Sequence, residues 1–129
     1  MDRRKILIVD DYPGALYMRG RILSEAGYEV IEATRGEDAL RIAADRQPSL
    51  VLLDVNLPDI SGTEVCERLK RDPATAAIPV IQITGAWISD EDRRVGLASG
   101  ANAYLTEPVD EVTLLRRVVE LLESATGGR

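Results

Sequence analysis

Five short runs of apolar, β-favouring residues recur along the chain, and each is followed by a segment long enough for a helix. Two of them, Ile6–Val9 and Leu50–Leu53, are almost continuously apolar. Strands covered by helices on both faces have this pattern, whereas strands with one face in water alternate apolar and polar residues. We therefore expect parallel strands, with the continuous runs at the centre, at Lys5–Val9, Glu29–Ala33, Leu50–Leu53, Val80–Thr84 and Ala103–Leu105.

Helix-start signals lie between these strands. A hydroxyl followed three residues later by a carboxylate can satisfy two free N–H groups at a helix start. This spacing occurs in Thr34 with Glu37, in Ser61 with Glu64 and, in a weaker form, in Ser89 with Asp92, and Asp110 can cap the last helix. Five strand–helix units joined by right-handed crossovers predict an α/β fold, an open, doubly wound parallel sheet with helices on both faces. Ligands of such sheets bind at the carboxyl ends of the strands.

The first helix is expected from about Pro13 to Ala26, with Gly27 as its stop. Its apolar residues at helical spacing are Ala15, Met18, Ile22 and Ala26.

The composition of the chain excludes several kinds of catalytic and metal site. The chain has 129 residues, which fits one domain, and it has a single cysteine, two lysines, fourteen arginines and no histidine. Without histidine there is no Ser/His or Cys/His nucleophile and no His-ligated zinc, so any chemistry falls to carboxylates. A net charge of −6 argues against direct binding to nucleic acid or anionic lipid. No apolar run approaches membrane-helix length and no signal peptide is apparent, so the expected location is cytoplasmic.

Three aspartates follow the two most apolar strands: Asp10, Asp11 and Asp54. Aspartate is also common where strands end, as a turn or cap residue. Three carboxylates at one sheet edge repel one another, however, and a hard divalent cation such as Mg²⁺ relieves that repulsion. A carboxylate beside Mg²⁺ can act as a nucleophile toward a phosphoryl group, and a hydroxyl such as that of Thr84 can donate to the phosphoryl oxygen.

The segments Leu7–Asp11, Leu52–Gly62, Ile83–Gly85 and Ala103–Pro108 together resemble a two-component response-regulator receiver domain. The resemblance covers about residues 5–123, so that 1–129 would be a single receiver domain with 125–129 as a tail or the start of a linker. It implies a flavodoxin-like sheet with strand order 2-1-3-4-5. It also implies a regulatory protein rather than an enzyme, phosphorylated by a histidine kinase or a histidine phosphotransfer protein.

The same resemblance implies roles for individual residues. Asp54 is the phosphoacceptor, and Mg²⁺ or Mn²⁺ is held by Asp10, Asp11, Asp54 and the backbone carbonyl of Asn56. Thr84 and Tyr104 form the switch pair that changes the surface of the fourth helix, fifth strand and fifth helix, a face that also suits a homodimer. Two further positions, Asn56 and Ala86, tune the loss of the phosphoryl group, and Pro108 follows a cis peptide bond.

One position departs from the family pattern. Receivers carry a lysine before the proline that follows the fifth strand, and this chain has Glu107. Glu107 either points into the site, where its charge opposes phosphorylation, or turns away as a solvated loop residue. Lys5 and Lys70 are expected at the opposite edge of the sheet, which leaves Arg35 and Arg93 as candidate replacement cations. The hypotheses are weaker phosphorylation, tighter or additional divalent-ion binding, or signalling that does not depend on phosphate.

The alternative function is therefore a degenerate receiver that acts as a phosphorylation-independent interaction or dimerisation module. A haloacid-dehalogenase-type phosphatase and a flavodoxin are disfavoured, the first because it needs a supporting lysine and a cap domain. The second needs a phosphate-cradling loop where Asp10 and Asp11 lie. Two surface features could serve partners: Trp87, and a wide apolar arc on the last helix that comprises Val112, Leu114, Leu115, Val118, Val119, Leu121 and Leu122.

Overall fold

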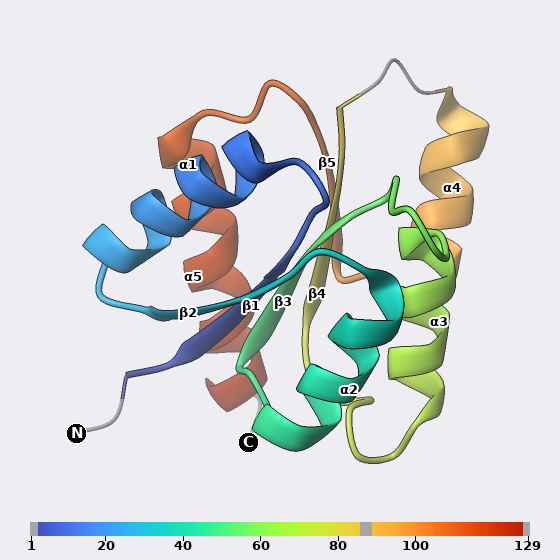
Figure 1. Cartoon of the computed structure of the whole chain (residues 1–129), viewed down its shortest axis with the longest axis horizontal. Coiled ribbons are helices and arrows are strands. Elements are labelled where there is room, and N and C mark those ends of the chain that lie inside the picture. Colours follow the sequence, from blue (N-terminus) through green and yellow to red (C-terminus); the bar gives the residue numbers. More distant parts are fainter. Residues whose placement is uncertain (1–2, 86–88, 128–129) are drawn as a thin grey trace.

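The computed structural model describes residues 3–85 and 89–127. Its strands form one parallel sheet in the order β2-β1-β3-β4-β5, and helices alternate with them (Figure 1). The strands are β1 (Lys5–Val9), β2 (Glu29–Ala33), β3 (Leu50–Asp54), β4 (Val80–Thr84) and β5 (Ala103–Thr106). The helices are α1 (Pro13–Glu25), α2 (Gly36–Arg46), α3 (Gly62–Arg71), α4 (Asp90–Ala98) and α5 (Glu111–Gly127). The predicted fold class and strand order are confirmed.

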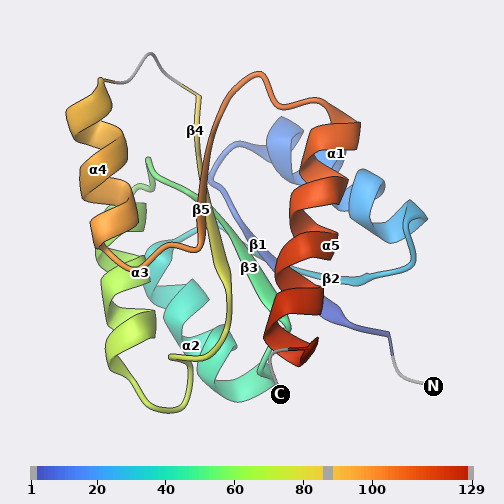
Figure 2. The ribbon, with the colours of Figure 1, turned by 180° about the vertical axis from the view of Figure 1, so that it is seen from behind.

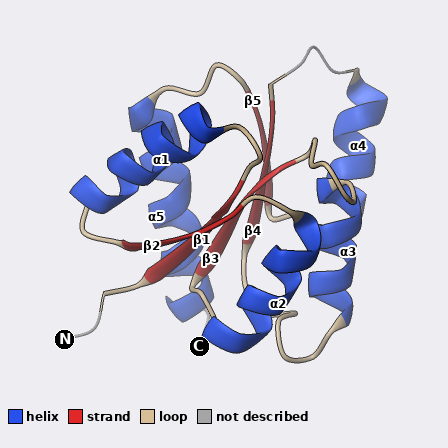
Figure 3. Cartoon of the chain, viewed as in Figure 1, coloured by secondary structure: helices blue, strands red, loops and turns tan. Residues whose placement is uncertain are grey.

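The helices cover both faces of the sheet. Figure 3 shows α1 and α5 on one face and α2, α3 and α4 on the other, and Figure 2 shows the first pair from behind. Alternate residues of each central strand enter different cores: Ile6 and Ile8 of β1 pack with α1 and α5, whereas Leu7 and Val9 pack with α2 and α3. All four side chains are fully buried, which explains the continuous apolar run.

Most of the predicted helix caps are present. The hydroxyl of Ser61 accepts the N–H of Glu64 at 3.1 Å, and Ser89 with Asp92 forms a complete capping box. The carboxylate of Asp110 accepts the N–H of Thr113 at 2.7 Å. After α1 the chain turns at Gly27, whose φ of 101° is a left-handed conformation that suits glycine.

The predicted cap of α2 is wrong. The N-cap residue is Arg35, one position later than Thr34, and it makes no side-chain cap hydrogen bond. Instead, the carboxylate of Asp59, in the loop after β3, accepts the N–H groups of Gly36 at 2.8 Å and Glu37 at 2.9 Å. A local spacing rule could not identify this cap, because its acceptor comes from more than twenty residues away.

The buried face of α1 contains an arginine. Its buried residues are Leu16, Arg19, Gly20 and Leu23, which follow the spacing of one helix face, whereas Met18 is 59% exposed. Leu16 and Leu23 lie on either side of Arg19 on this face. The guanidinium of Arg19 is therefore inside the protein, next to the carboxyl edge of the sheet.

The last helix buries part of its wide apolar arc. Leu114, Val118 and Leu122 are in the core, whereas Val112 and Val119 are exposed. The helix continues to Gly127, so the first residues of the predicted tail at 125–129 are helical. Trp87 lies outside the described residues. Among the described residues, no helix is long and apolar enough to span a membrane.

The cap of α2 generates a prediction about pH. Its hydrogen bonds, first that from Glu37, hold the pKa of Asp59 at about 2, below its usual 3.8. Because the folded-state pKa is depressed, this stabilisation is complete above about pH 4 and is lost as the pH falls toward 2. Asp59→Ala should lower the thermal midpoint at pH 7 but not at pH 2, as measured by circular dichroism. Asp59→Asn, whose amide oxygen can still accept one N–H, should lose less at pH 7, and equal losses in the two variants would contradict the assignment.

Candidate functional site

The carboxyl ends of β1 and β3 bring three aspartates together. Asp10 and Asp11 follow β1 and Asp54 ends β3, and one carboxylate oxygen from each lies within 4.8 Å of the other two. Asp10 is buried, Asp54 is half-buried and Asp11 is exposed. They line a cavity of about 270 Å³ whose walls also include Asn56 and Glu107. The predicted convergence of these carboxylates is present, and their oxygen ligands at this spacing fit a hard divalent cation.

The pKa of Asp54 is raised to about 6, and its causes describe the site. Burial is the largest cause and the charge of Asp10 the second, while the Asn56 N–H and the Arg19 guanidinium act in the opposite direction. Repulsion between neighbouring carboxylates raises a pKa in this way when no cation separates them. The site is thus an acidic cluster with one basic side chain beside it.

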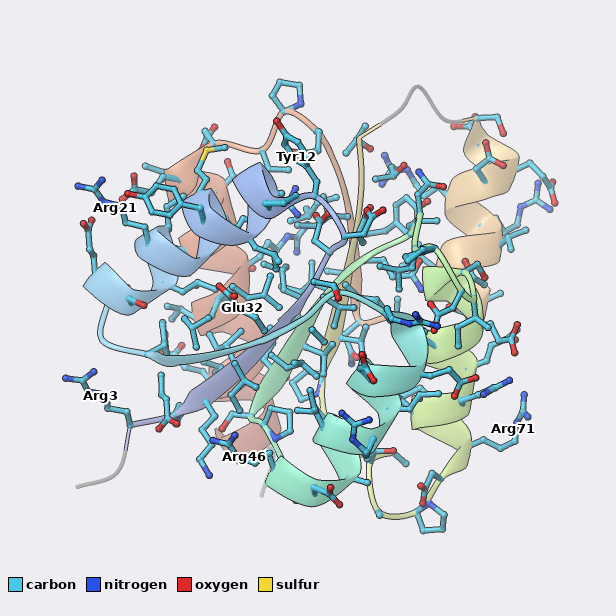
Figure 4. The ribbon with its side chains drawn as sticks, viewed as in Figure 1. Arg3, Tyr12, Arg21, Glu32, Arg46 and Arg71 are labelled. Atoms are coloured by element: carbon cyan, nitrogen blue, oxygen red, sulfur yellow. The ribbon has the colours of Figure 1, made fainter. Side chains whose placement is uncertain are left out.

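The carboxylate of Asp10 is fixed on both of its oxygens. Oδ1 accepts the backbone N–H of Tyr12 at 2.9 Å, and Oδ2 accepts the Arg19 Nη1 proton at 2.8 Å. Figure 4 shows Tyr12 at this edge of the sheet, whereas Arg3 and Arg46 lie toward the opposite end. Asp10 is therefore held in one orientation by its own loop and by α1.

Glu107 is turned toward the site and is paired. Its carboxylate accepts the Arg19 Nη2 proton at 2.5 Å, and its backbone N–H donates to the Thr84 carbonyl oxygen at 2.8 Å. The sequence left two orientations possible for Glu107, and the side chain adopts the inward one. Its charge is compensated by Arg19. The Glu107–Pro108 peptide bond is cis.

The candidate replacement cations are elsewhere. Arg35 is exposed at the start of α2, and Arg93 donates to the Tyr104 carbonyl at 3.2 Å and to the Thr106 hydroxyl at 3.4 Å. Lys70 donates to the Ile78 carbonyl at 2.6 Å, near the amino end of β4, as its expected position requires. Arg19 was not among the candidates from the sequence, although it lies in the helix that follows β1.

Thr84 and Tyr104 lie beside a second cavity of about 300 Å³, under α4. Its walls also include Asn56, so the two cavities are neighbours around the loop after β3. Thr84 is buried at the end of β4, and Tyr104 is only 8% exposed. Ala86, a predicted tuning position, lies outside the described residues.

The tyrosine ring is held inward by α4. A Cβ atom at Gly96 would overlap the ring of Tyr104, so only glycine leaves room for it at that position. The guanidinium of Arg93 lies 5.7 Å from the ring centroid, within the range of a cation–π contact. The side chain that the sequence suggested as a switch therefore adopts a packed, buried position.

Comparisons with known proteins identify the family. A model of the response regulator receiver domain matches residues 6–119. This chain belongs to that family. Receiver domains are regulatory parts of two-component systems and bind Mg²⁺ in their acidic pocket, and the described residues contain the corresponding aspartate cluster.

The relatives are response regulators of different lengths. The chain is 38% identical to protein PilH of Pseudomonas aeruginosa over 118 residues, which cover 92% of this chain and 97% of PilH. It is 44% identical to the response regulator PleD of Caulobacter vibrioides, but the match covers 91% of this chain and 26% of PleD. The DNA-binding regulator RpaA of Synechocystis is 42% identical, with 92% of this chain and 48% of RpaA covered. The chain thus spans less than half of PleD and of RpaA.

Solved structures show the same fold. A CheY-like receiver domain protein from Methanospirillum hungatei has a TM-score of 0.91 at 32% identity and covers 99% of this chain and 100% of its own. The receiver domain of the sensor histidine kinase PA1611 from Pseudomonas aeruginosa has a TM-score of 0.88 at 26% identity and covers 95% and 100%. That structure has a magnesium ion coordinated in its active-site cleft.

Removing the central carboxylate tests the electrostatics of the site. The folded-state pKa of Asp54, about 6, lies above its usual 3.8. The unfolding free energy of wild type therefore falls as the pH rises from 3.8 to about 6. In metal-free buffer at pH 7, Asp54→Asn should raise that free energy by about 1–2 kcal/mol, after a discount for solvent screening. Urea denaturation from pH 4 to 7 measures this, with Asp11→Asn as a control of smaller effect. A loss of stability would contradict the repulsion.

A second test concerns the packing of Tyr104. Gly96→Ala should force the ring outward and cost about 1–3 kcal/mol, despite the better helix propensity of alanine. Gly20→Ala is the matched control, because Gly20 lies in α1 and its added Cβ would meet only ordinary contacts at 3.6 and 3.8 Å. That variant should gain about 0.5–1 kcal/mol. Urea denaturation and a crystal structure of Gly96→Ala check both expectations, and an unmoved ring would contradict the first.

Proposed function

We propose that this chain is a phosphoacceptor receiver in which Asp54 takes a phosphoryl group from a histidine kinase or a histidine phosphotransfer protein. The observation that supports it is the cluster of Asp10, Asp11 and Asp54, with oxygens within 4.8 Å, at the carboxyl edge of the sheet. Their cavity is open to a donor on the side of the exposed Asp11 and Tyr12.

The bonds that form and break in this reaction belong to the chain and its donor. An oxygen of the Asp54 carboxylate attacks the phosphorus of a phosphohistidine, forming a phosphorus–oxygen bond to give an acyl phosphate. The phosphorus–nitrogen bond breaks, and the imidazole nitrogen keeps the electron pair and takes up a proton. The cavity at Asp54 has room for a phosphoryl group, and the Asn56 N–H already donates to this carboxylate.

Asp10, Asp11, Asp54 and the backbone carbonyl of Asn56 are the proposed ligands of Mg²⁺ or Mn²⁺. The ion, when bound, neutralises the negative charge that accumulates on the phosphoryl oxygens. Asp10 enters this set already oriented, because Tyr12 and Arg19 hold both of its oxygens. The chain's contribution is thus a fixed carboxylate beside two that are more exposed.

Residues at the second cavity transmit the effect of phosphorylation to the protein surface. The Thr84 hydroxyl donates to the phosphoryl oxygen, and Tyr104 reports the change to the surface of α4, β5 and α5, which presents exposed Val112 and Val119. This face serves downstream partners or a second copy of the chain. Asn56 and Ala86 set the rate at which the phosphoryl group is lost. The absence of direct nucleic-acid binding stays a prediction.

The degenerate-receiver alternative rested on Glu107 standing in place of the usual lysine. Since Arg19 pairs with that carboxylate, the site retains a cation and the observation that favoured the alternative is weakened. We keep it as one outcome of the experiment that follows.

Intact-mass spectrometry after incubation with Mg²⁺ and acetyl phosphate tests the proposal. Wild type should gain a single phosphoryl adduct, and Asp54→Asn should gain none, because the amide is not a nucleophile. Removal of Mg²⁺ with EDTA should abolish the adduct, and Asp59→Asn, a carboxylate change outside the cavity, is the matched control. An adduct that persists in Asp54→Asn, or its absence from wild type, would refute the phosphoacceptor assignment.

A further inference from the structure

Arg19 is an unusual residue of α1. Among the described residues it is the only buried lysine or arginine, with its side chain 9% exposed. Arginine is almost never fully buried unless it is paired. The guanidinium is paired twice, with Asp10 through Nη1 and with Glu107 through Nη2. Arg19 lies in the middle of the Leu16–Leu23 face, where an apolar residue would pack. A buried charge at this position indicates a functional role for the side chain.

The pattern of the strands explains why these three residues meet. Asp10 lies one position beyond β1 and Glu107 one position beyond β5, and both continue the strand residues that face α1 and α5. Arg19 projects from α1 into the same layer. The two carboxylates belong to strands that are separated by β3 and β4 in the sheet, and the planar guanidinium reaches both.

The backbone around this bridge is fixed as well. Asp10 is held by the Tyr12 N–H, and the Glu107 backbone donates to Thr84 of β4. Arg19 is absent from the walls of the cavity, whereas both of its partners line it. Its contacts with the site are therefore those with Asp10 and Glu107, which make it a positioning residue, and its charge also reaches Asp54. Counting Arg19 lowers the net negative charge of the site by one compared with four unpaired carboxylates.

We propose that Arg19 and Glu107 together replace the missing lysine: Glu107 clamps the guanidinium of α1 against Asp10, and the pair promotes phosphorylation of Asp54. This inference rests on the proposed function and deepens it. It reverses the expectation from the sequence, in which Glu107 opposes the reaction. The clamp keeps Asp10 oriented, and it pairs the Glu107 carboxylate, which lines the cavity, with a cation.

Changing the charge at position 107 distinguishes this proposal from one in which Glu107 only repels phosphate. If Glu107 only repels phosphate, then Glu107→Gln and Glu107→Lys each accelerate phosphorylation. If Glu107 clamps Arg19, both variants slow it, the second because a lysine there faces a buried guanidinium. The decisive variant is Arg19→Leu with Glu107→Lys, which supplies a lysine at the usual position and an apolar residue between Leu16 and Leu23.

The experiment measures the rate of the Asp54 adduct at saturating Mg²⁺ and acetyl phosphate, on variants that circular dichroism shows to be folded. In this step the Asp54 oxygen bonds to phosphorus and acetate leaves with the electrons of the broken phosphorus–oxygen bond. Arg19→Leu and Glu107→Lys should each be slower by about tenfold, an ordinary coupling between contacting charges, and the double variant should recover to within about threefold of wild type. Glu107→Gln should be slower by a smaller factor.

A stability measurement without metal or phosphate helps to distinguish a positioning role of the Arg19–Glu107 pair from a purely structural role. Urea denaturation in EDTA of the two single variants and the double variant should show that the effects on unfolding are not additive, because the residues are in contact. A purely structural bridge would give this coupling but leave the saturated rate unchanged, and that result would overturn the proposal. Single variants as fast as wild type or faster would also overturn it.

The outcomes also distinguish this inference from the proposed function. If wild type gains no adduct while the double variant gains one on Asp54, the Arg19–Glu107 pair does not replace the lysine and the chain is a degenerate receiver. If no variant gains an adduct on Asp54, the phosphoacceptor function itself fails. If wild type is phosphorylated and the single variants are equally fast, only the positioning role fails.

Discussion

The central strands β1 and β3 are buried on both faces, and this burial determines where every functional side chain lies. Ile6, Leu7, Leu52 and Leu53 are all at most 1% exposed, and their alternation between two cores leaves no freedom of register. A shift of one residue would place each side chain on the wrong face. The carboxylates of Asp10 and Asp54 therefore emerge at the same edge, where the apolar cover ends and solvent can reach them.

Bringing these carboxylates together costs electrostatic free energy, and the chain offsets part of it from within. The buried guanidinium of Arg19 bonds to Asp10 and to Glu107, so the site has one positive charge even without an ion. The pKa of Asp54 stays raised, by its burial first and by the charge of Asp10 second, so one guanidinium does not neutralise the cluster. A partly compensated acidic cluster of this kind fits a divalent cation, and receiver domains bind Mg²⁺ in their acidic pocket.

The second half of the site depends on shape rather than charge. Tyr104 packs into the space that Gly96 leaves in α4, and Arg93 covers the ring and ties α4 to the backbone of β5. The same helix begins with the Ser89–Asp92 capping box, close in sequence to the end of β4. Movement of the Tyr104 ring is thus coupled to α4 and β5 by direct contact, which gives the proposed output surface a physical basis.

The sequence by itself predicted the parallel sheet and the convergence of Asp10, Asp11 and Asp54, and the family resemblance added the strand order. It also showed that Glu107 replaces the usual lysine. These follow from strand periodicity and from motifs in which neighbouring residues carry the signal. Tertiary structure alone decided the partner of Glu107, because Arg19 is 88 residues away in the chain. It also decided the cap of α2, since Asp59 reaches it from another loop. Contacts between residues far apart in the chain depend on how the layers pack, and local patterns do not record that packing.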